Sequence, residues 1–323
     1  MKYHRLTQQE RYQIYALLKE GLTLSAIAKN IGKDKSTISR ELQRNTGQKG
    51  YRPKQANELS QMRIASKIKP THLTAIQVSY IEEKIQLKWS PEQISGRMKI
   101  DGLFHVSHET IYRYILKDKH NGGKLYMHLR HKHKRYKRRY GSNNRRGQIP
   151  NKVSIDERPS VVDDKERIGD FEIDLIIGRH HKQALVTVVD RKSKFTLIKK
   201  IPHKQSSLVE VALIEMLLPV KKWLHTITSD NGKEFAAHEA VAKCLDTDFY
   251  FCHPYSSWER GLNENTNGLI RQFFPKGSEF THITQAQIME AQNNLNYRPR
   301  KSLGYKTPAE VFYATILELE GSA

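Results

Sequence analysis

Three acidic residues in the second half of the chain constrain its fold more than any other feature. Asp174 lies in GDFEIDLIIG, Asp230 in TSDNGKEF, and Glu264 in SSWERGLNENTNGLIR, 34 positions after Asp230. The first two stand at or beside predicted strand ends, whereas the third lies on a predicted helix. Hard divalent cations such as Mg²⁺ bind carboxylate oxygens, and a pair of them can clamp the attacking and leaving oxygens of a phosphoryl transfer. The layout is that of a nuclease-type metal site.

Period-two alternation predicts a strand at DFEIDLII. Glu172 and Asp174 point to one face, and the apolar side chains point to the other, namely Phe171, Ile173, Leu175 and Ile177. ALVTVVDR and FTLIKKI follow as two more β-rich runs, which predicts a three-stranded meander. After a helix at 206–218, the strand HTIT leads to Asp230, and the following Asn-Gly pair predicts a tight turn that holds this carboxylate at a strand end. Taken alone, Asp230 could merely shape that turn.

The helix that carries Glu264 is predicted to run from about Trp258 to Phe273. One face presents the residues at positions i, i+4, i+7 and i+11, namely Arg260, Glu264, Asn267 and Arg271. This face could be a solvated set of ion pairs. Glycines at 261 and 268 weaken the helix, which favours close approach of a backbone or substrate instead. Glu259, on a different face, is the competing candidate for the third carboxylate.

With these flanks in view, residues 167–312 resemble the retroviral-integrase-like DDE transposases of bacterial insertion sequences, most closely the family named after insertion sequence thirty. The resemblance is carried by GDFEIDLI, TSDNGKEFA, PYSSWERGLNENTNGLIRQFFPKG and LNYRPRKSLGYKTPAEVF. It implies a ribonuclease-H-like fold in which Asp174, Asp230 and Glu264 hold two Mg²⁺ ions, with Mn²⁺ as a substitute. It also implies that Arg271, seven positions after the catalytic Glu, contacts DNA phosphate near the cut, and Arg260 on the same face is a further candidate DNA contact.

The chain departs from the family pattern at three positions. Phe171 stands where the family often has Trp, Ile173 where it often has Gly, and Ser257 where it often has Pro. None of these changes removes a metal ligand, so they concern local packing only. Four further acidic residues could support the site from behind the ligands: Asp170, Glu172, Asp190 and Glu234.

The N-terminal third is predicted to be helical. Thr7 and Glu10 have capping-box spacing at the start of a first helix, a second helix ends at Gly32, and Ser36 can cap a third. Two short helices joined by a tight turn are typical of a helix-turn-helix. The outward face of the third helix carries side chains suited to base edges and phosphates in a major groove, namely Thr37, Arg40 and Arg44. A plain three-helix bundle is the alternative.

A similar pattern returns downstream, where Thr74, Ser90 and Ser107 can each cap a helix. It predicts a second helix-turn-helix-like unit whose candidate reading residues are His108, Glu109, Thr110 and Arg113. A bundle without a role in DNA binding is a stronger alternative here, because generic capped helices give many false matches.

The most basic stretch of the chain lies between the helical and catalytic parts. Residues 119–152 contain twelve Lys or Arg and no Asp or Glu. Such a segment cannot bury its own core, so it is either a solvated linker or an arm laid along a DNA backbone. The candidate phosphate contacts at its centre are Lys134, Arg135, Lys137, Arg138 and Arg139.

Composition agrees with a nucleic-acid partner. The 323 residues allow two or three domains, and the formal net charge of +21 favours a polyanion. A membrane surface is the other reading, but there is no apolar run of transmembrane length and MKYHRLTQQER lacks the apolar core of a signal peptide. We therefore expect a cytoplasmic, nucleoid-associated bacterial protein with no membrane partner. Cys244 and Cys252 fit neither a disulfide framework nor a zinc site.

The expected organisation is multidomain, with N-terminal all-α helix-turn-helix units and a C-terminal α/β ribonuclease-H-like catalytic domain. In chain order we expect a helix-turn-helix domain at 1–47, a linker at 48–70, a second helix-turn-helix-like domain at 71–118, a basic linker or DNA-binding arm at 119–165, and the catalytic domain with C-terminal helices at 166–323.

The expected function is that of a transposase that binds terminal inverted repeats and target DNA as double strands. It would nick an element end, and the freed 3′-hydroxyl would then attack another phosphodiester. A homodimer or larger oligomer is expected because two ends must meet. One alternative is a DNA-binding regulator of a mobile element whose catalytic domain has decayed. The other is a ribonuclease-H-type enzyme acting on RNA–DNA hybrids, which would not need two helix-turn-helix units.

Neutralising the five basic residues of the arm at 134–139 to Gln tests the DNA-arm interpretation. Affinity should fall for all DNA sequences alike, and the slope of log K against log salt should flatten by roughly 0.9 for each lost phosphate contact, because fewer counterions are released. Fluorescence anisotropy over a salt series measures this slope. An unchanged slope would show that the segment is only a tether.

Overall fold

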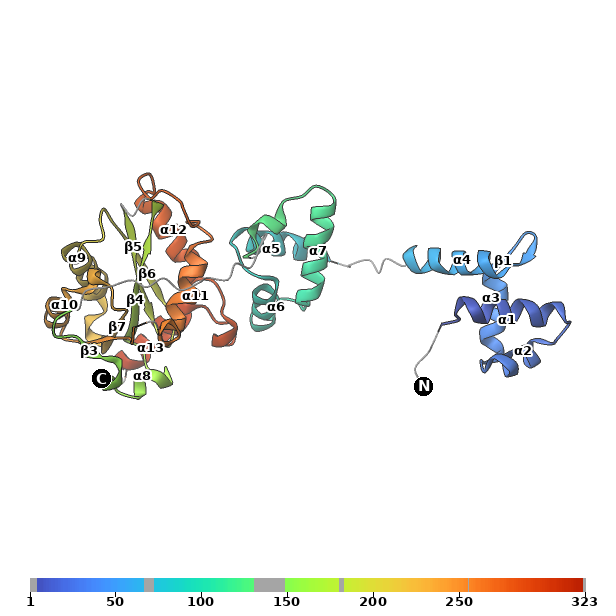
Figure 1. Cartoon of the computed structure of the whole chain (residues 1–323), viewed down its shortest axis with the longest axis horizontal. Coiled ribbons are helices and arrows are strands. Elements are labelled where there is room, and N and C mark those ends of the chain that lie inside the picture. The colour runs from blue at the N-terminus through green and yellow to red at the C-terminus, as the bar shows by residue number, and fades with distance from the viewer. Residues whose placement is uncertain (1–4, 67–72, 131–148, 180–182, 255, 322–323) are drawn as a thin grey trace. The chain divides into compact units, whose positions relative to one another are not determined.

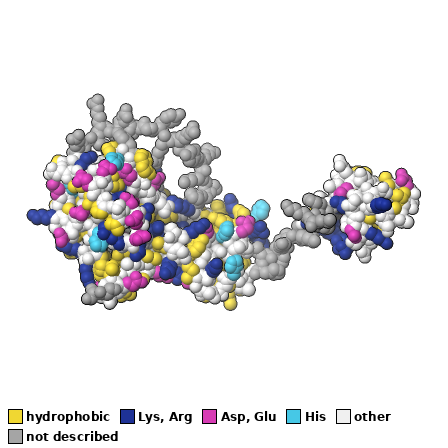
Figure 2. Space-filling view, turned by 90° about the horizontal axis from the view of Figure 1, so that it is seen from below, with side chains coloured by type: hydrophobic (Ala, Val, Ile, Leu, Met, Phe, Trp, Pro, Cys, Tyr) yellow, Lys and Arg dark blue, Asp and Glu magenta, His cyan; other side chains and the backbone are white. Residues whose placement is uncertain are grey.

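A computed structural model of the chain describes residues 5–66, 73–130, 149–179, 183–254 and 256–321 (Figure 1). The chain divides into a first unit, Met1–His72, and a second unit, Leu73–Ala323. Within the described residues, no helix is both long enough and apolar enough to span a membrane. On the face seen in Figure 2, the Lys and Arg side chains of the second unit are scattered among acidic ones.

The first unit is a small helical domain. Its elements are α1 (Gln8–Lys19), α2 (Leu24–Ile31), α3 (Lys35–Asn45), the hairpin strands β1 (Thr46–Gly47) and β2 (Gly50–Tyr51), and α4 (Pro53–Ser66). Thr7 caps α1 through the predicted capping box with Glu10. The cap of α3 is Asp34, whose carboxylate accepts from the backbone N–H of Ser36, so our assignment of Ser36 as the cap is wrong.

Residues 53–66, which we expected in a linker, form the fourth helix of this domain. Asn57 of α4 accepts from Arg11 at 3.1 Å, and Arg63 donates to the carbonyl of Arg44 at 3.2 Å and to the Asn45 side chain. These last two acceptors lie at the C-terminal end of α3, where helix carbonyls have no partner within the helix. Helix α4 therefore supports the end of α3 and belongs to the folded unit.

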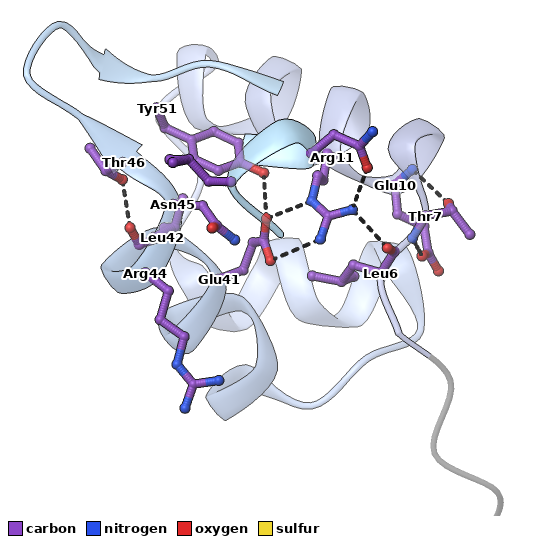
Figure 3. Close-up of polar contacts among 12 residues, drawn as sticks. Leu6, Thr7, Glu10, Arg11, Glu41, Leu42, Arg44, Asn45, Thr46 and Tyr51 are labelled. Atoms are coloured by element: carbon purple, nitrogen blue, oxygen red, sulfur yellow. Dashed lines mark hydrogen bonds and ion pairs between the residues drawn. The ribbon is translucent and has the colours of Figure 1, made fainter. Parts of the chain in front are cut away.

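A buried ion pair joins α1 to α3 (Figure 3). The Nε of Arg11 lies 2.7 Å from Oε1 of Glu41, and the two side chains are 4% and 7% exposed. Arg11 also donates to the carbonyl of Leu6 at 2.8 Å, and the Tyr51 hydroxyl donates to Glu41 at 3.4 Å. Burial, and then the Glu41 charge, raise the pKa of Tyr51, so this donor stays protonated. The network fixes α3 against its neighbours.

The second unit begins with three helices, α5 (Ala75–Gln86), α6 (Pro91–Ile100) and α7 (His108–His120), followed by the 3₁₀ turn η1 (Leu125–His128). Thr74, Ser90 and Ser107 cap the three helices as predicted. Their inward faces make one apolar cluster that includes Ile81 and Ile111.

Helix α6 packs against a later segment of the same unit. Arg97 lies 2.7 Å from a carboxylate oxygen of Glu310, and Arg298 donates to Gln93 at 2.8 Å. Gly96 faces the ring of Tyr305 so closely that a Cβ there would lie 2.4 Å from it. The three-helix group is thus attached to the C-terminal part of the chain by polar contacts and by one close ring-to-backbone approach.

The rest of the second unit is built on a six-stranded mixed sheet of order β3-β8-β7-β4-β5-β6. Its strands are β3 (Val153–Ser154), β4 (Asp170–Ile177), β5 (Ala184–Asp190), β6 (Thr196–Ile201), β7 (Thr226–Ser229) and β8 (Asp248–Phe251). Strands β4, β5 and β6 form the predicted antiparallel meander, whereas β4, β7, β8 and β3 pair in parallel.

Helices cover both faces of this sheet (Figure 1). One face packs against α9 (Ser206–Leu217), α10 (His238–Leu245) and α13 (Pro308–Gly321), and the other against α11 (Gly261–Ile270) and α12 (Gln285–Asn296). The short elements are η2 (Ile155–Glu157), α8 (Val161–Asp164), η4 (Leu218–Trp223), η5 (Lys233–Phe235), η6 (Ser257–Arg260) and η7 (Lys301–Leu303). The predicted apolar face of β4 is confirmed, since Phe171, Ile173 and Leu175 are buried in the core that α9, α10 and α13 cover.

The Glu264 helix is shorter than predicted. Residues from Ser257 to Arg260 form the 3₁₀ turn η6, and the α-helix proper begins at Gly261 and ends at Ile270. Residues 149–165, which we assigned to the basic arm, pack on the sheet instead: Ile149 is buried in the core and β3 pairs with β8. The basic residues 134–139 lie outside the described residues.

Replacing Glu41 with Gln should destabilise the first unit by about 3 to 5 kcal/mol, because the buried Arg11 guanidinium would lose its carboxylate. Hydrogen exchange of the α3 amides in the full chain measures the loss. The double variant Arg11→Met with Glu41→Leu is the control, since replacing both partners with apolar groups should recover most of the stability. Full protection of α3 in Glu41→Gln would contradict the assigned role of the pair.

Candidate active site and DNA-reading surface

Parallel pairing of β4 with β7 brings Asp174 and Asp230 together. The observed register sets Glu172 beside Thr228, an offset of 56 positions. The same offset carries Asp174 to Asp230, one residue past the end of β7. Two positions along a strand return to the same face, so both carboxylates project from the face that α11 covers.

Gly169 holds the start of this register. Its carbonyl accepts from the backbone N–H groups of His225 and Thr226, and its φ is +95°. A Cβ at this position would lie 1.7 Å from the Trp223 carbonyl oxygen. Only glycine fits a backbone that combines this φ with so close an approach.

The guanidinium of Arg260 lies between the two aspartates. It is 3.6 Å from Oδ1 of Asp174 and 3.3 Å from Oδ2 of Asp230, and it donates to the carbonyl of Ile173 at 3.1 Å. Burial raises the pKa of Asp174, Arg260 opposes this rise, and the Asp230 charge adds to it. Burial alone would lower the pKa of Arg260, but the two carboxylates raise it. The pair of aspartates thus holds one cationic side chain.

Asn267 orients the other oxygen of Asp174. Its amide donates to Oδ2 at 2.8 Å, and its own oxygen accepts from the Thr187 hydroxyl at 3.3 Å. Thr187 lies directly across from Asp174 in the β4–β5 ladder. The sequence placed Asn267 on the right helical face but gave it no role, and Thr187 was missed. The period-two pattern of β5 was the signal that could have found Thr187.

Glu264 is exposed on α11, and its carboxylate makes no contact that the structure describes. Among the described residues no three Asp, Glu, His or Cys side chains converge as a metal cluster. Glu264 lies three residues before Asn267, which contacts Asp174, so the two side chains share one face of α11. The structure therefore brings Asp174 and Asp230 together and leaves Glu264 exposed on α11.

Glu259 is engaged elsewhere. Its carboxylate lies 2.8 Å from Nδ1 of His253, and Nε2 of the same ring lies 2.9 Å from Asp156. Hydrogen bonds to Glu259 and then to Asp156 raise the pKa of His253, which favours the charged ring that holds both carboxylates. Glu259 is thus paired with His253 and has no described contact with the aspartate pair.

The other acidic candidates have structural partners. Asp170 lies 2.8 Å from Arg167, Glu172 lies 3.1 Å from Arg191 and accepts from the backbone of Asn263, and Asp190 accepts from the backbone of Gly169. Burial raises the pKa of Glu172, against the pull of Arg191. Glu234, of η5, makes no such pair among the described residues. Asp170, Glu172 and Asp190 therefore make structural contacts around the site.

The carboxylate oxygens of the two aspartates, together with the Arg260 guanidinium that lies between them, show that this pair fits divalent metal ions. Each aspartate offers a carboxylate oxygen toward the point that Arg260 now neutralises, and carboxylate oxygens are the ligands preferred by Mg²⁺ and Mn²⁺. The side chains of Asp174 and Asp230 are 25% and 32% exposed, so ions from solvent can reach them.

Arg271 does not face the aspartates. It donates to the carbonyl of Ile177 at 2.9 Å and its guanidinium lies over the ring of Phe280. Its role in DNA binding stays a prediction, as does that of Arg113, which is exposed and paired with Glu109 at 3.3 Å.

A groove of about 570 Å³ lies along α3 of the first unit. Thr37, Arg40 and Arg44 line it as the sequence suggested, and the other lining residues include Arg5 and Ser60. Arg40 and Arg44 are exposed, and Figure 3 shows Arg44 pointing away from the buried ion pair. The candidate reading face is therefore basic and open, and α4 and the N-terminal segment extend it beyond the residues that the sequence indicated.

The chain is similar to known proteins over most of its length. Residues 2–45 match the family model of a helix-turn-helix domain. The transposase for insertion sequence element IS4351 of Bacteroides fragilis is 47% identical over 313 residues, which cover 96% of each chain. Transposase InsI for insertion sequence element IS30A of Escherichia coli strain K12 is 38% identical over 95% of this chain and 82% of its own length. The catalytic core domain of BIV integrase is 21% identical, covers 48% of this chain and 97% of its own, and has a TM-score of 0.37.

A helix-turn-helix domain and similarity over nearly the whole length to transposases of insertion sequences define this chain as a DDE-type polynucleotidyl transferase, as the sequence predicted. The chain belongs to the IS30 family of insertion-sequence transposases, and its activity is DNA transposition.

Replacing Arg40 and Arg44 with Ala should weaken binding to the element ends while leaving non-specific nicking in Mn²⁺. Each lost bidentate base contact is worth about 1 to 3 kcal/mol of discrimination. Competition binding against scrambled DNA measures the specificity ratio. If the double variant binds its ends with unchanged affinity and preference, α3 is not the end-reader.

Proposed function

We propose that this transposase binds the terminal inverted repeats of its element and carries out both strand cleavage and strand transfer at one site that holds two Mg²⁺ ions. The observation that carries the proposal is that Asp174 of β4 and Asp230, directly after the adjacent parallel strand β7, both lie within ion-pair distance of the Arg260 guanidinium. Glu264 of α11 would complete the ligand set.

The residues of this chain would divide the work in a definite way. Asp174, Asp230 and Glu264 would hold the ions, and Asn267 would keep the Asp174 carboxylate in its present orientation through its 2.8 Å hydrogen bond. When bound, the ions activate a water or a 3′-hydroxyl and stabilise the charge that develops on the phosphate. Glu172 and Asp170 would stabilise the strand that carries Asp174 through their arginine partners.

Three carboxylates and two divalent ions sum to a net charge of +1, which favours a phosphodiester. A hydrolytic nick and a transfer reaction differ only in whether water or a 3′-hydroxyl attacks, so one arrangement can serve both. No side chain near the aspartates is needed as a covalent nucleophile. Because two ends must be joined, we also propose a homodimer or larger assembly on paired ends.

Charge-neutral variants of the three carboxylates test the proposal. Asp174→Asn, Asp230→Asn and Glu264→Gln keep side-chain volume but remove a charge that holds a metal ion, so each should abolish cleavage and transfer while sparing end binding. Cleavage and joining of a labelled element end in Mg²⁺ measure the first effect, and anisotropy measures the second. Glu234→Gln is the control and should stay active, because that side chain has no described contact with the aspartates.

Glu259→Gln separates the two candidates for the third ligand. Activity in Glu264→Gln together with inactivity in Glu259→Gln would show that the third ligand has been misplaced. Activity in all three carboxylate variants would reject the two-metal site altogether.

A further inference from the structure

We propose that Arg260 is a built-in counter-cation, which holds Asp174 and Asp230 together until divalent ions replace it and which is then released toward DNA phosphate. This inference rests on the proposed metal site and concerns how that site is filled.

The guanidinium and the metal ions would use the same oxygens. Arg260 lies 3.6 Å from Oδ1 of Asp174 and 3.3 Å from Oδ2 of Asp230, and its side chain is only 11% exposed. A divalent ion that entered this space would meet a positive charge at close range, and like charges repel strongly where solvent is sparse. Occupation by the guanidinium and occupation by metal are therefore mutually exclusive.

The present position of Arg260 is well paired but incomplete. Its terminal nitrogens donate one hydrogen bond, to the Ile173 carbonyl, and form ion pairs with Asp174 and Asp230, whereas its Nε is buried and has no hydrogen-bond partner among the described residues. An unpaired buried donor costs free energy, so a second position in which Nε is solvated or meets an acceptor would remove that cost.

The local backbone favours movement of the side chain alone. Arg260 ends the turn η6 and precedes Gly261, where an added Cβ would meet nothing within 4 Å. The preceding residue of the same turn, Glu259, is held by His253 at 2.8 Å. The turn is thus held at Glu259, whereas Gly261, which follows Arg260, has open space beside it.

Charge explains why DNA would promote the exchange. With Arg260 in place, the three carboxylates carry a net −2, which repels a phosphodiester. With two divalent ions and Arg260 released, they carry +1, and the guanidinium becomes available to a phosphate oxygen. By linkage, DNA and metal ions should then increase each other's affinity.

A Mn²⁺ titration of the full chain without DNA, followed by the electron paramagnetic resonance signal of free Mn²⁺, tests this proposal. Arg260→Gln should bind Mn²⁺ about tenfold more tightly than the natural chain, because a competing charge has been removed. Its melting temperature in EDTA should fall, and Mn²⁺ should raise it by more than it does for the natural chain. Lys233→Gln is the control. It removes an equal charge three residues from Asp230, without a described contact to it, and should change neither the Mn²⁺ affinity nor the melting temperature.

Arg260→Lys provides a second route if Arg260→Gln is too unstable without metal. It keeps the charge but cannot bridge both carboxylates with a planar fork, so Mn²⁺ binding should tighten by a smaller factor. Unchanged or weaker Mn²⁺ binding in both variants would overturn the proposal, and weaker binding would mean that Arg260 helps to assemble the metal site.

The aspartate variants keep the two proposals separable. If Asp174→Asn abolishes Mn²⁺ binding while Arg260→Gln does not tighten it, the counter-cation inference fails and the metal site stands. If Asp174→Asn and Asp230→Asn both bind Mn²⁺ like the natural chain, the metal site itself is wrong.

Discussion

The parallel pairing of β4 with β7 is the constraint on which the catalytic half of this transposase depends. It places Asp174 level with Asp230, although 56 positions separate them in the chain. Gly169 holds the start of the pairing, because its carbonyl joins the two strands where no larger residue would fit. A slip of one residue would turn Asp174 to the opposite face, into the apolar core, and would separate the two carboxylates.

Local patterns in the sequence predicted most elements correctly, and they failed where partners are distant. The period-two alternation around Asp174 gave the meander, and capping residues such as Thr7 and Ser107 gave the helix starts. No local pattern shows which strand lies beside β4, because parallel pairing joins remote segments. Helix α4 was missed because it shows no clear apolar stripe: its side chains Met62 and Ile64 are exposed.

The candidate site shows the same division. Its candidate carboxylates were chosen from their flanking residues, and the ion pair of Glu172 with Arg191 could not be read from those residues. The position of Arg260 between two aspartates was not predicted, since helical spacing gives the face of a side chain and not its partner, and its DNA contact stays a prediction. The attachment of α6 to the C-terminal segment also depends on remote contacts, such as Arg97 with Glu310. This attachment joins the group of helices α5, α6 and α7 to the part of the chain that carries the site.

The most direct test of the account is the location of metal ions in crystals of the full chain grown with an element end and Mn²⁺. Anomalous scattering from Mn²⁺ identifies each ion and the side chains bonded to it. The account predicts ions bonded to carboxylate oxygens of Asp174, Asp230 and Glu264, with the Arg260 guanidinium displaced from between the aspartates. Ions bonded to Glu172 or Glu259, or Arg260 still bridging the aspartates beside a bound ion, would contradict it.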